Sequence, residues 1–107
     1  MRRAILVTVL FFCFTTTAYA DIVFWNGNKL WEYCQGVQSR SQPAREGICM
    51  GYVAAIADAF ADCIPGGVTV GQATDIVYNY LRDHPERRHE IASRLVQSAL
   101  VEKFPCK

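Results

Sequence analysis

Residues 48–63 read ICMGYVAAIADAFADC, and this stretch indicates the fold of the chain most clearly. Its apolar residues recur at intervals of three and four, the spacing of one face of an α-helix. This face comprises Ile48, Tyr52, Ile56, Ala59 and Cys63, widened by Val53 and Phe60. Alanines fill the other faces and let neighbouring backbones approach closely. The pattern predicts a helix over 48–63 that is the most buried helix of a small bundle, and the IPGG that follows ends it.

One short helix is expected on the N-terminal side, over residues 28–35, with Asn28 as its N-cap and Gly36 as its C-terminal stop. The next stretch, VQSRSQPAREG, loses the apolar periodicity and contains Pro43. Such a composition is typical of a loop. The sequence therefore predicts a helix, a long polar connection and then the alanine-rich helix.

Two further helices are expected on the C-terminal side. The first opens at Thr69, whose spacing to Gln72 fits a capping box. Its apolar face comprises Val70, Ala73, Val77, Tyr80 and Leu81. The second begins near Pro85, which suits a first helical turn, and runs towards Lys103. Its apolar stripe comprises Ile91, Ala92, Leu95, Val96, Ala99 and Leu100. No stretch alternates like a strand, so the predicted fold is all-α, a small four-helix up-down bundle.

The cysteines are expected to staple this bundle with two disulfides. Cys49 and Cys63 lie at opposite ends of one predicted helix, ~21 Å apart at a rise of 1.5 Å per residue. A disulfide tolerates Cα atoms no more than ~7 Å apart, so these two cannot bond to each other. An up-down trace brings Cys34 to Cys49 at one end and Cys106 to Cys63 at the other. We therefore expect the pairs Cys34–Cys49 and Cys63–Cys106.

The first 20 residues, MRRAILVTVLFFCFTTTAYA, read as a signal peptide. They combine two arginines, an apolar run too short to span a bilayer, and an Ala-x-Ala site before Asp21. We expect cleavage after Ala20, which leaves one domain over 21–107 with four cysteines and no membrane segment. An even number of cysteines in a small exported chain is typical of an oxidising compartment. For a signal of bacterial type, that compartment is the periplasm.

The remaining composition favours a binding protein over an enzyme. Without the two leader arginines, nine of the 11 basic residues stand against 10 acidic ones, a net charge of −1. Nucleic-acid or membrane binding would call for a basic stripe. His84 and His89 lie about 140° apart on a helix, so they do not share a metal-facing side. Cysteines held in disulfides supply no thiol nucleophile. We expect no catalysis, no metal and no cofactor, and a role in binding another macromolecule.

Four segments in order carry a family resemblance: WEYC, CMGYVAAIADAF, CIPGGVTVGQATDIVYNYLRDHPE and the closing FPC. Together they resemble the type VI secretion system amidase immunity protein family, known as Tai or Rap immunity proteins. The resemblance spans the chain from about Leu30 to Cys106. Its most specific parts are the C-x-G-Y run, the C-I-P turn, the Y-L-x-x-H-P-E segment and the terminal P-C.

The resemblance implies a function in competition between bacteria. Members of this family are periplasmic, helical and often homodimeric, and they bind a cognate peptidoglycan amidase injected by another cell. They block the active-site cleft of this effector and carry out no chemistry themselves. This chain would accordingly be the inhibitor of an amidase effector, and a homodimer is open as its working unit.

Partner recognition is expected where the family motifs stop, because the motifs mark disulfides, turns and core. The candidates are the loop over 38–46, with Arg40 and Arg45, and the exposed face of the third helix. That face carries Asp75, Tyr78, Asn79 and Arg82. Tyrosine and arginine are enriched among the residues that dominate protein–protein binding.

Two alternative functions fit the same features. One is a small periplasmic stress or chaperone-like helical protein, and the other is an inhibitor of a different periplasmic enzyme. A neighbouring reading frame for a small Cys-His amidase would favour immunity. Protection of client proteins at low pH would favour the chaperone.

Overall fold

The computed structural model describes residues 23–39 and 41–106, and these form an all-α bundle of four helices. The helices are α1 (Gly27–Ser39), α2 (Pro43–Ala59), α3 (Val70–Asp83) and α4 (Ala92–Lys103). Two 3₁₀ turns, η1 (Ala61–Cys63) and η2 (Pro85–Arg87), follow α2 and α3. The described residues contain no strand, and one isolated bridge joins Asn26 to Ile91. The predicted fold class is confirmed, whereas the predicted signal peptide over 1–20 lies outside the described residues.

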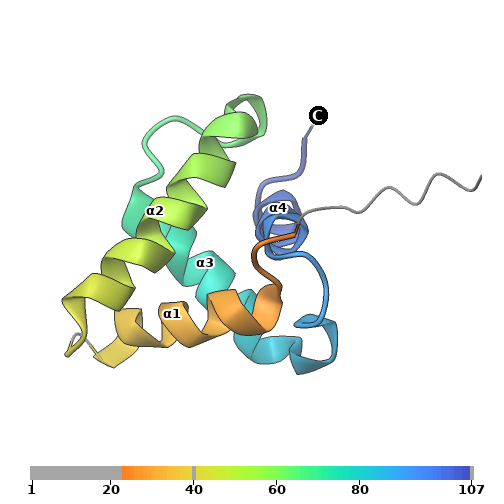
Figure 1. Ribbon diagram of the computed structural model, residues 1–107. Helices are drawn as coiled ribbons and strands as arrows, with labels where there is room; N and C mark the ends of the chain where they lie inside the picture. The colour runs from red at the N-terminus through yellow and green to blue at the C-terminus, as the bar shows by residue number, and fades with distance from the viewer. Residues whose placement is uncertain (1–22, 40, 107) are drawn as a thin grey trace, which may run out of the picture.

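Each of the four helices contacts the three others. Figure 1 shows α1 along the lower edge, α2 rising from its end, α3 passing behind, and α4 seen nearly along its axis. None of the four is both long and apolar enough to cross a membrane, a statement that applies to the described residues alone.

The core is supplied mainly by α3 and α4, whose predicted apolar stripes face inward. The buried hydrophobic residues of these two helices are Ala73, Val77, Tyr80, Leu81, Ala92, Leu95, Val96, Ala99 and Leu100, and the polar Thr74 is buried as well. Leu30 of α1 and Val53 of α2 complete the centre. Two stripe positions differ from the prediction because they lie at helix ends. Val70, the first residue of α3, is 44% exposed, and Ile91 is half-buried where it precedes α4.

The prediction that the alanine-rich helix is the most buried one is wrong. In α2 only Cys49 and Val53 are buried, and Ile48 is 41% exposed. Residues 48–57 of this helix include no charged side chain, so their composition could not identify which side faces the core. The helix also ends earlier than predicted, at Ala59, and the chain reaches Cys63 through η1.

The predicted boundaries of the first helix are wrong as well. Asn26, not Asn28, is the N-cap, because its Oδ1 accepts a hydrogen bond from the Lys29 N–H at 3.0 Å. Gly36 does not stop the helix, which continues to Ser39. A β-carbon at Gly36 would lie 3.1 Å from the Arg45 Cβ and 3.3 Å from the Glu46 nitrogen. The absence of a side chain at Gly36 therefore allows α1 and α2 to approach closely.

The long polar loop predicted over 37–47 is mostly helical. Residues 37–39 belong to α1, and α2 already begins at Pro43. Proline suits this place because the first helical turn has no partner for its N–H. In α3 the prediction is confirmed, since Thr69 and Gln72 exchange both capping-box bonds, at 3.1 and 2.9 Å. Pro85 opens η2 instead of α4, which begins seven residues later at Ala92.

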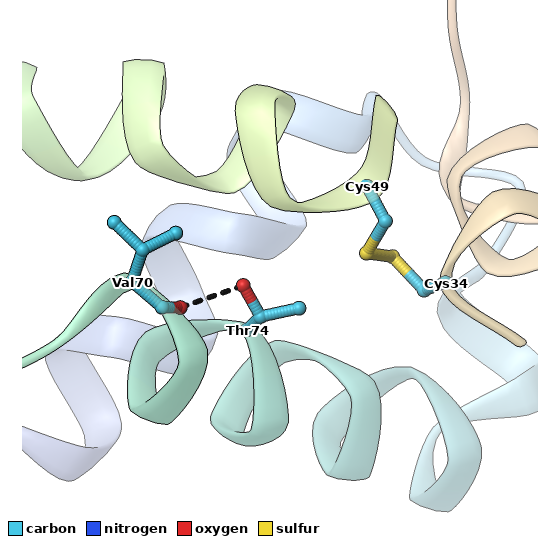
Figure 2. The surroundings of a disulfide bond; sticks show 4 residues. All are labelled: Cys34, Cys49, Val70 and Thr74. Atoms are coloured by element: carbon cyan, nitrogen blue, oxygen red, sulfur yellow. Dashed lines mark hydrogen bonds between the residues drawn. A yellow bond between two sulfur atoms is a disulfide. The ribbon is translucent and has the colours of Figure 1, made fainter. Parts of the chain in front are cut away.

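Both predicted disulfides are present. Cys34 and Cys49 join α1 to α2 with Cα atoms 5.0 Å apart. Figure 2 shows this bridge and, on α3, the Thr74 hydroxyl that donates to the Val70 carbonyl. Cys63 and Cys106 join η1 to the segment after α4, with Cα atoms 4.7 Å apart. Chain-entropy estimates for loops of 15 and 43 residues are about 3 and about 4 kcal/mol. These values are comparable with the whole net stability of a small domain.

Candidate binding face

One surface combines side chains of α1 and α3 and is called the α1–α3 face below. It consists of Trp31 and Gln38 of α1, Asp75, Tyr78 and Arg82 of α3, and Arg88 after η2. On α3 the positions recur at intervals of three and four, so they share one side of the helix. On α1 the two positions lie two turns apart and also share one side.

An aromatic pair occupies the centre of this face. The rings of Trp31 and Tyr78 stack with their centroids 5.1 Å apart and their planes at 28°. Both side chains are half-buried and pack against the core. Such a pair contributes about 0.5–1.5 kcal/mol beyond the area that it buries. It therefore holds α1 and α3 together while part of each ring stays at the surface.

Arg88 is a second contact of the Trp31 ring. Its guanidinium carbon lies 4.2 Å from the centre of the Trp31 ring, a cation–π contact. Its Nε donates to the Leu81 carbonyl at 2.7 Å, and its Nη2 donates to the Arg82 carbonyl at 3.3 Å. These carbonyls belong to the last turn of α3 and lack helical partners, so the arginine also caps that helix. Trp31 is held in place before any partner arrives.

Arg82 marks the basic end of the face. Its Nε lies 2.9 Å from the Asp83 carboxylate in an exposed ion pair. The hydrogen bond from Arg82 lowers the pKa of the Asp83 carboxyl. Exposed pairs of this kind contribute little to stability, because solvent and salt screen them. Breaking it to bind another carboxylate would accordingly cost little.

A polar hollow between α1, α2 and α3 forms the opposite end. It is lined by Val37, Gln38, Glu46, Met50, Gly71, Thr74 and Asp75. Glu46 and Asp75 place two carboxylates there. Within the described part of the chain, neither belongs to an ion pair. The α1–α3 face thus runs from an acidic hollow across two aromatic rings to two arginines.

The predicted recognition residues are distributed over three places. Asp75, Tyr78 and Arg82 lie on the α1–α3 face, and Asn79 lines a second hollow, between α3 and α4. Arg45 lies elsewhere, 3.7 Å from the Glu32 carboxylate and over the Tyr33 ring. Arg40 falls outside the described residues. Residues 38–46 are not one loop, because the ends of two helices occupy most of that range.

Trp31 and Arg88 belong to the face but are not among the predicted recognition residues. Trp31 directly follows the core residue Leu30, and a tryptophan next to a core residue can lie either inside the bundle or at its edge. Arg88 reaches Trp31 only because η2 turns the chain back across the end of α3. No local pattern in the sequence signals that return.

A second aromatic group secures the N-terminal segment. The Trp25 ring stacks with both Tyr33 and Tyr52, and the ring centroids are 5.0 Å apart in each pair. Burial raises the pKa of the Tyr52 hydroxyl, although a hydrogen bond with Ser93 opposes this shift. The Trp25 carbonyl accepts a bond from the Ala92 N–H at 3.1 Å. This group fastens residues before α1 to α2 and α4, which is a structural role.

His84 contacts a backbone carbonyl and an aromatic ring, whereas His89 is exposed. The His84 ring stacks on Tyr80 with centroids 4.1 Å apart, and its Nδ1 lies 2.8 Å from the Tyr80 carbonyl oxygen. Arg87 donates to the Tyr80 hydroxyl and pairs with Glu90 at 2.7 and 3.1 Å. The described residues hold no group of three or more His, Cys, Asp or Glu side chains that could bind a metal ion. This cluster connects α3 to the segment before α4.

Comparison with known proteins adds one finding. No curated protein and no solved structure matches the chain. The family model of the Rap1a immunity proteins matches residues 26–106. The match runs from the N-cap of α1 to the last cysteine, so it includes all four helices and both disulfides. The chain belongs to the Rap1a immunity protein family.

Proposed function

We propose that this protein is a periplasmic immunity protein that binds a peptidoglycan amidase effector of a type VI secretion system and blocks its active-site cleft. Membership of an immunity family supports the binding of a secreted protein effector. Such families are typically non-enzymatic. The further proposal that this effector is an amidase rests on the resemblance of the cysteine and turn motifs.

The proposed location rests on two features of the chain. The first 20 residues read as a cleavable signal peptide. The two disulfides need a compartment in which thiols are oxidised. An effector that cuts peptidoglycan would act in that same compartment, so the inhibitor would meet it there.

The α1–α3 face is the proposed contact with the effector, and the Trp31–Tyr78 pair is the observation that carries this assignment. Tryptophan, tyrosine and arginine are the residues that most often dominate binding energy. The stack and the Arg88 contact already restrict the Trp31 and Tyr78 rings. Rings that are ordered before binding lose less conformational entropy when a partner covers them.

The charges at the two ends of the face give the complex an orientation. The carboxylates of Glu46 and Asp75 would meet basic groups of the effector, and Arg82 would meet an acidic group. Complementary charges at an interface fix its register and speed association more than they raise affinity. The homodimer implied by the family resemblance remains part of the proposal, and sedimentation of the purified chain measures it.

Rescue of growth tests the proposed function. A candidate peptidoglycan amidase, sought as a small Cys-His reading frame beside this gene, is exported to the periplasm of a test strain, alone or with the full-length protein. We expect lysis with the amidase alone and growth when the protein is present. The purified protein should also inhibit hydrolysis of peptidoglycan fragments by the purified amidase. Failure of both, together with protection of client proteins at low pH, would support the chaperone-like alternative.

A double variant locates the contact. Trp31→Ala with Tyr78→Ala should abolish the rescue, whereas Arg94→Ala, an exposed change on α4, should retain it. Circular dichroism and a thermal melt must show that the double variant is folded. If the folded double variant inhibits the amidase as well as the natural sequence, the effector binds another surface.

A further inference from the structure

The two disulfides differ sharply in their access to solvent. Cys34 and Cys49 are each 0% exposed and lie within the hydrophobic core. Cys106 is exposed and Cys63 is half-buried. A thiol in solution can therefore reach the second bridge in the folded protein, whereas the first requires opening of the core.

The surroundings of the second bridge are also open. It lies in a surface hollow between residues 62–65 and residues 103–106. Phe104 donates the last backbone hydrogen bond of the described C-terminal segment, to the Leu100 carbonyl at 2.7 Å. Pro105 has no N–H to donate. The disulfide is thus the main attachment of residues 105–106 to the rest of the bundle.

We propose that Cys63–Cys106 is a redox-sensitive clip, which a thioredoxin-type dithiol opens while Cys34–Cys49 stays closed. One thiolate of the dithiol attacks the exposed Cys106 Sγ, forms a mixed disulfide and releases the Cys63 thiolate, which takes up a proton. The second thiol of the reductant then attacks the mixed disulfide and releases Cys106. Two electrons and two protons pass to the protein, and the reductant becomes a disulfide.

Opening the clip affects one region of the molecule and leaves the α1–α3 face unchanged. Residues 60–69 and the segment after α4 lose their covalent connection. The α1–α3 face keeps its own support, because Cys34–Cys49, the Trp31–Tyr78 stack and Arg88 do not depend on the clip. The clip would thus control the stability and lifetime of the protein without altering the face. This inference does not rest on the identity of the effector.

Trapping of thiols during reduction tests the clip. The oxidised mature chain is incubated with dithiothreitol at 25 °C in the absence of denaturant, and samples are alkylated at intervals and mapped by mass spectrometry. We expect Cys63 and Cys106 to be alkylated about 10-fold faster than Cys34 and Cys49, or more, because only the latter need an opening of the core. Equal rates, or faster reduction of Cys34–Cys49, would overturn the proposal.

A variant without the clip supplies the second measurement. Cys63→Ala with Cys106→Ala should keep the helical circular dichroism of the natural sequence and melt at a lower temperature. Its remaining disulfide, Cys34–Cys49, should still be reduced more slowly than Cys63–Cys106 is in the natural sequence, because it stays buried in the folded variant. If this variant fails to fold, the reduction rates of the two disulfides in the natural sequence still show whether Cys63–Cys106 opens first. A rate for Cys63–Cys106 equal to the global unfolding rate would refute selective opening.

Discussion

Gly27, at the first position of α1, lies directly against Leu95 of α4. A β-carbon at Gly27 would overlap the Leu95 Cδ1 and lie 2.8 Å from both the α-carbon and the carbonyl oxygen of Arg88. The Gly27 N–H donates to the Glu90 carbonyl at 2.9 Å, and the Asn28 N–H donates to the Arg88 carbonyl at 2.8 Å. The start of α1 is therefore in backbone contact with the segment before α4, and only glycine fits there.

Gly27→Ala is expected to destabilise the protein by about 1–3 kcal/mol, the usual cost of overpacking a core. Backbone atoms of Arg88 cannot move aside as the end of a flexible side chain can. Urea unfolding followed by circular dichroism measures the change. The matched control is Gly51→Ala, because a β-carbon at this exposed position in α2 meets nothing within 4 Å. That control should stabilise the protein by about 0.5–1 kcal/mol, and a loss of stability there would contradict the reasoning.

The apolar stripes of α3 and α4 were predictable because each helix has one apolar and one polar side. The stripe of α2 was not, since alanine and glycine surround this helix and give no direction. The disulfide pairs were also predictable, because Cys49 and Cys63 are too far apart to bond to each other and an up-down trace chooses between the two pairings that remain. By contrast, the approach of Gly36 to Arg45 needs two helices packed in space, and a sequence reads such a glycine as a helix stop.

The candidate face was predictable only on α3. Asp75, Tyr78 and Arg82 share one side of a single helix, which periodicity can show. Trp31 and Arg88 come from other segments, and their meeting depends on how α1 crosses α3 and how η2 turns. Residues that are brought together by tertiary structure leave no local pattern.

Loss of Arg88 should weaken both the fold and the face. Arg88→Ala removes two hydrogen bonds to the last turn of α3 and the cation–π contact with Trp31. We expect a destabilisation of about 1–3 kcal/mol, typical of hydrogen bonds from a charged group. Arg88→Lys should recover only a minor part, because an ammonium cannot reproduce the planar fork. Chemical denaturation measures the loss, and a full recovery by lysine would show that charge alone matters.

The Trp31–Tyr78 stack predicts that the two aromatic side chains depend on each other. Tyr78→Phe should preserve the stack and leave stability within about 0.5 kcal/mol of the natural sequence, as for most surface changes. Tyr78→Ala should cost about 0.5–1.5 kcal/mol from the lost ring pair, in addition to the area exposed. A double-mutant cycle with Trp31→Ala isolates the interaction. Strict additivity of the two alanine changes would mean that the rings do not interact.

Acid should weaken the connection between α3 and α4 through Glu90. The hydrogen bond from Arg87 lowers the pKa of the Glu90 carboxyl below its usual value of 4.5. A lowered pKa in the folded state stabilises the fold above pH 4.5, and this stabilisation disappears as the pH falls through the lowered value. Thermal melts between pH 6 and pH 2 should therefore show a decline that Glu90→Gln makes shallower.

The effect of Glu90→Gln should be small, because the Arg87–Glu90 pair lies at the surface and salt screens it. Glu86→Gln is the control, since this carboxylate belongs to no ion pair among the described residues. It should leave the acid-dependent decline unchanged. If both glutamine variants flatten the decline equally, net charge and not the Arg87–Glu90 pair is responsible.

The buried disulfide should matter more for stability than the exposed one, although chain entropy alone gives the opposite order. Loop lengths of 15 and 43 residues favour Cys63–Cys106 by about 1 kcal/mol. Cys34 and Cys49, however, are fully buried, and deleting each buried sulfur costs on the order of 1 kcal/mol or more in lost contacts and cavity. Replacing both buried cysteines therefore costs about 2 kcal/mol in lost packing, a cost that replacing Cys63 and Cys106 does not carry.

Burial thus outweighs the difference in loop length, and the order of stabilities follows from it. Cys34→Ala with Cys49→Ala is expected to unfold at a lower urea concentration than Cys63→Ala with Cys106→Ala. Equilibrium unfolding of both double variants, under identical conditions and with the slope of each transition compared, measures this order. The reverse order with equal slopes would mean that loop closure in the unfolded chain, and not packing around Cys34 and Cys49, determines what each bridge contributes.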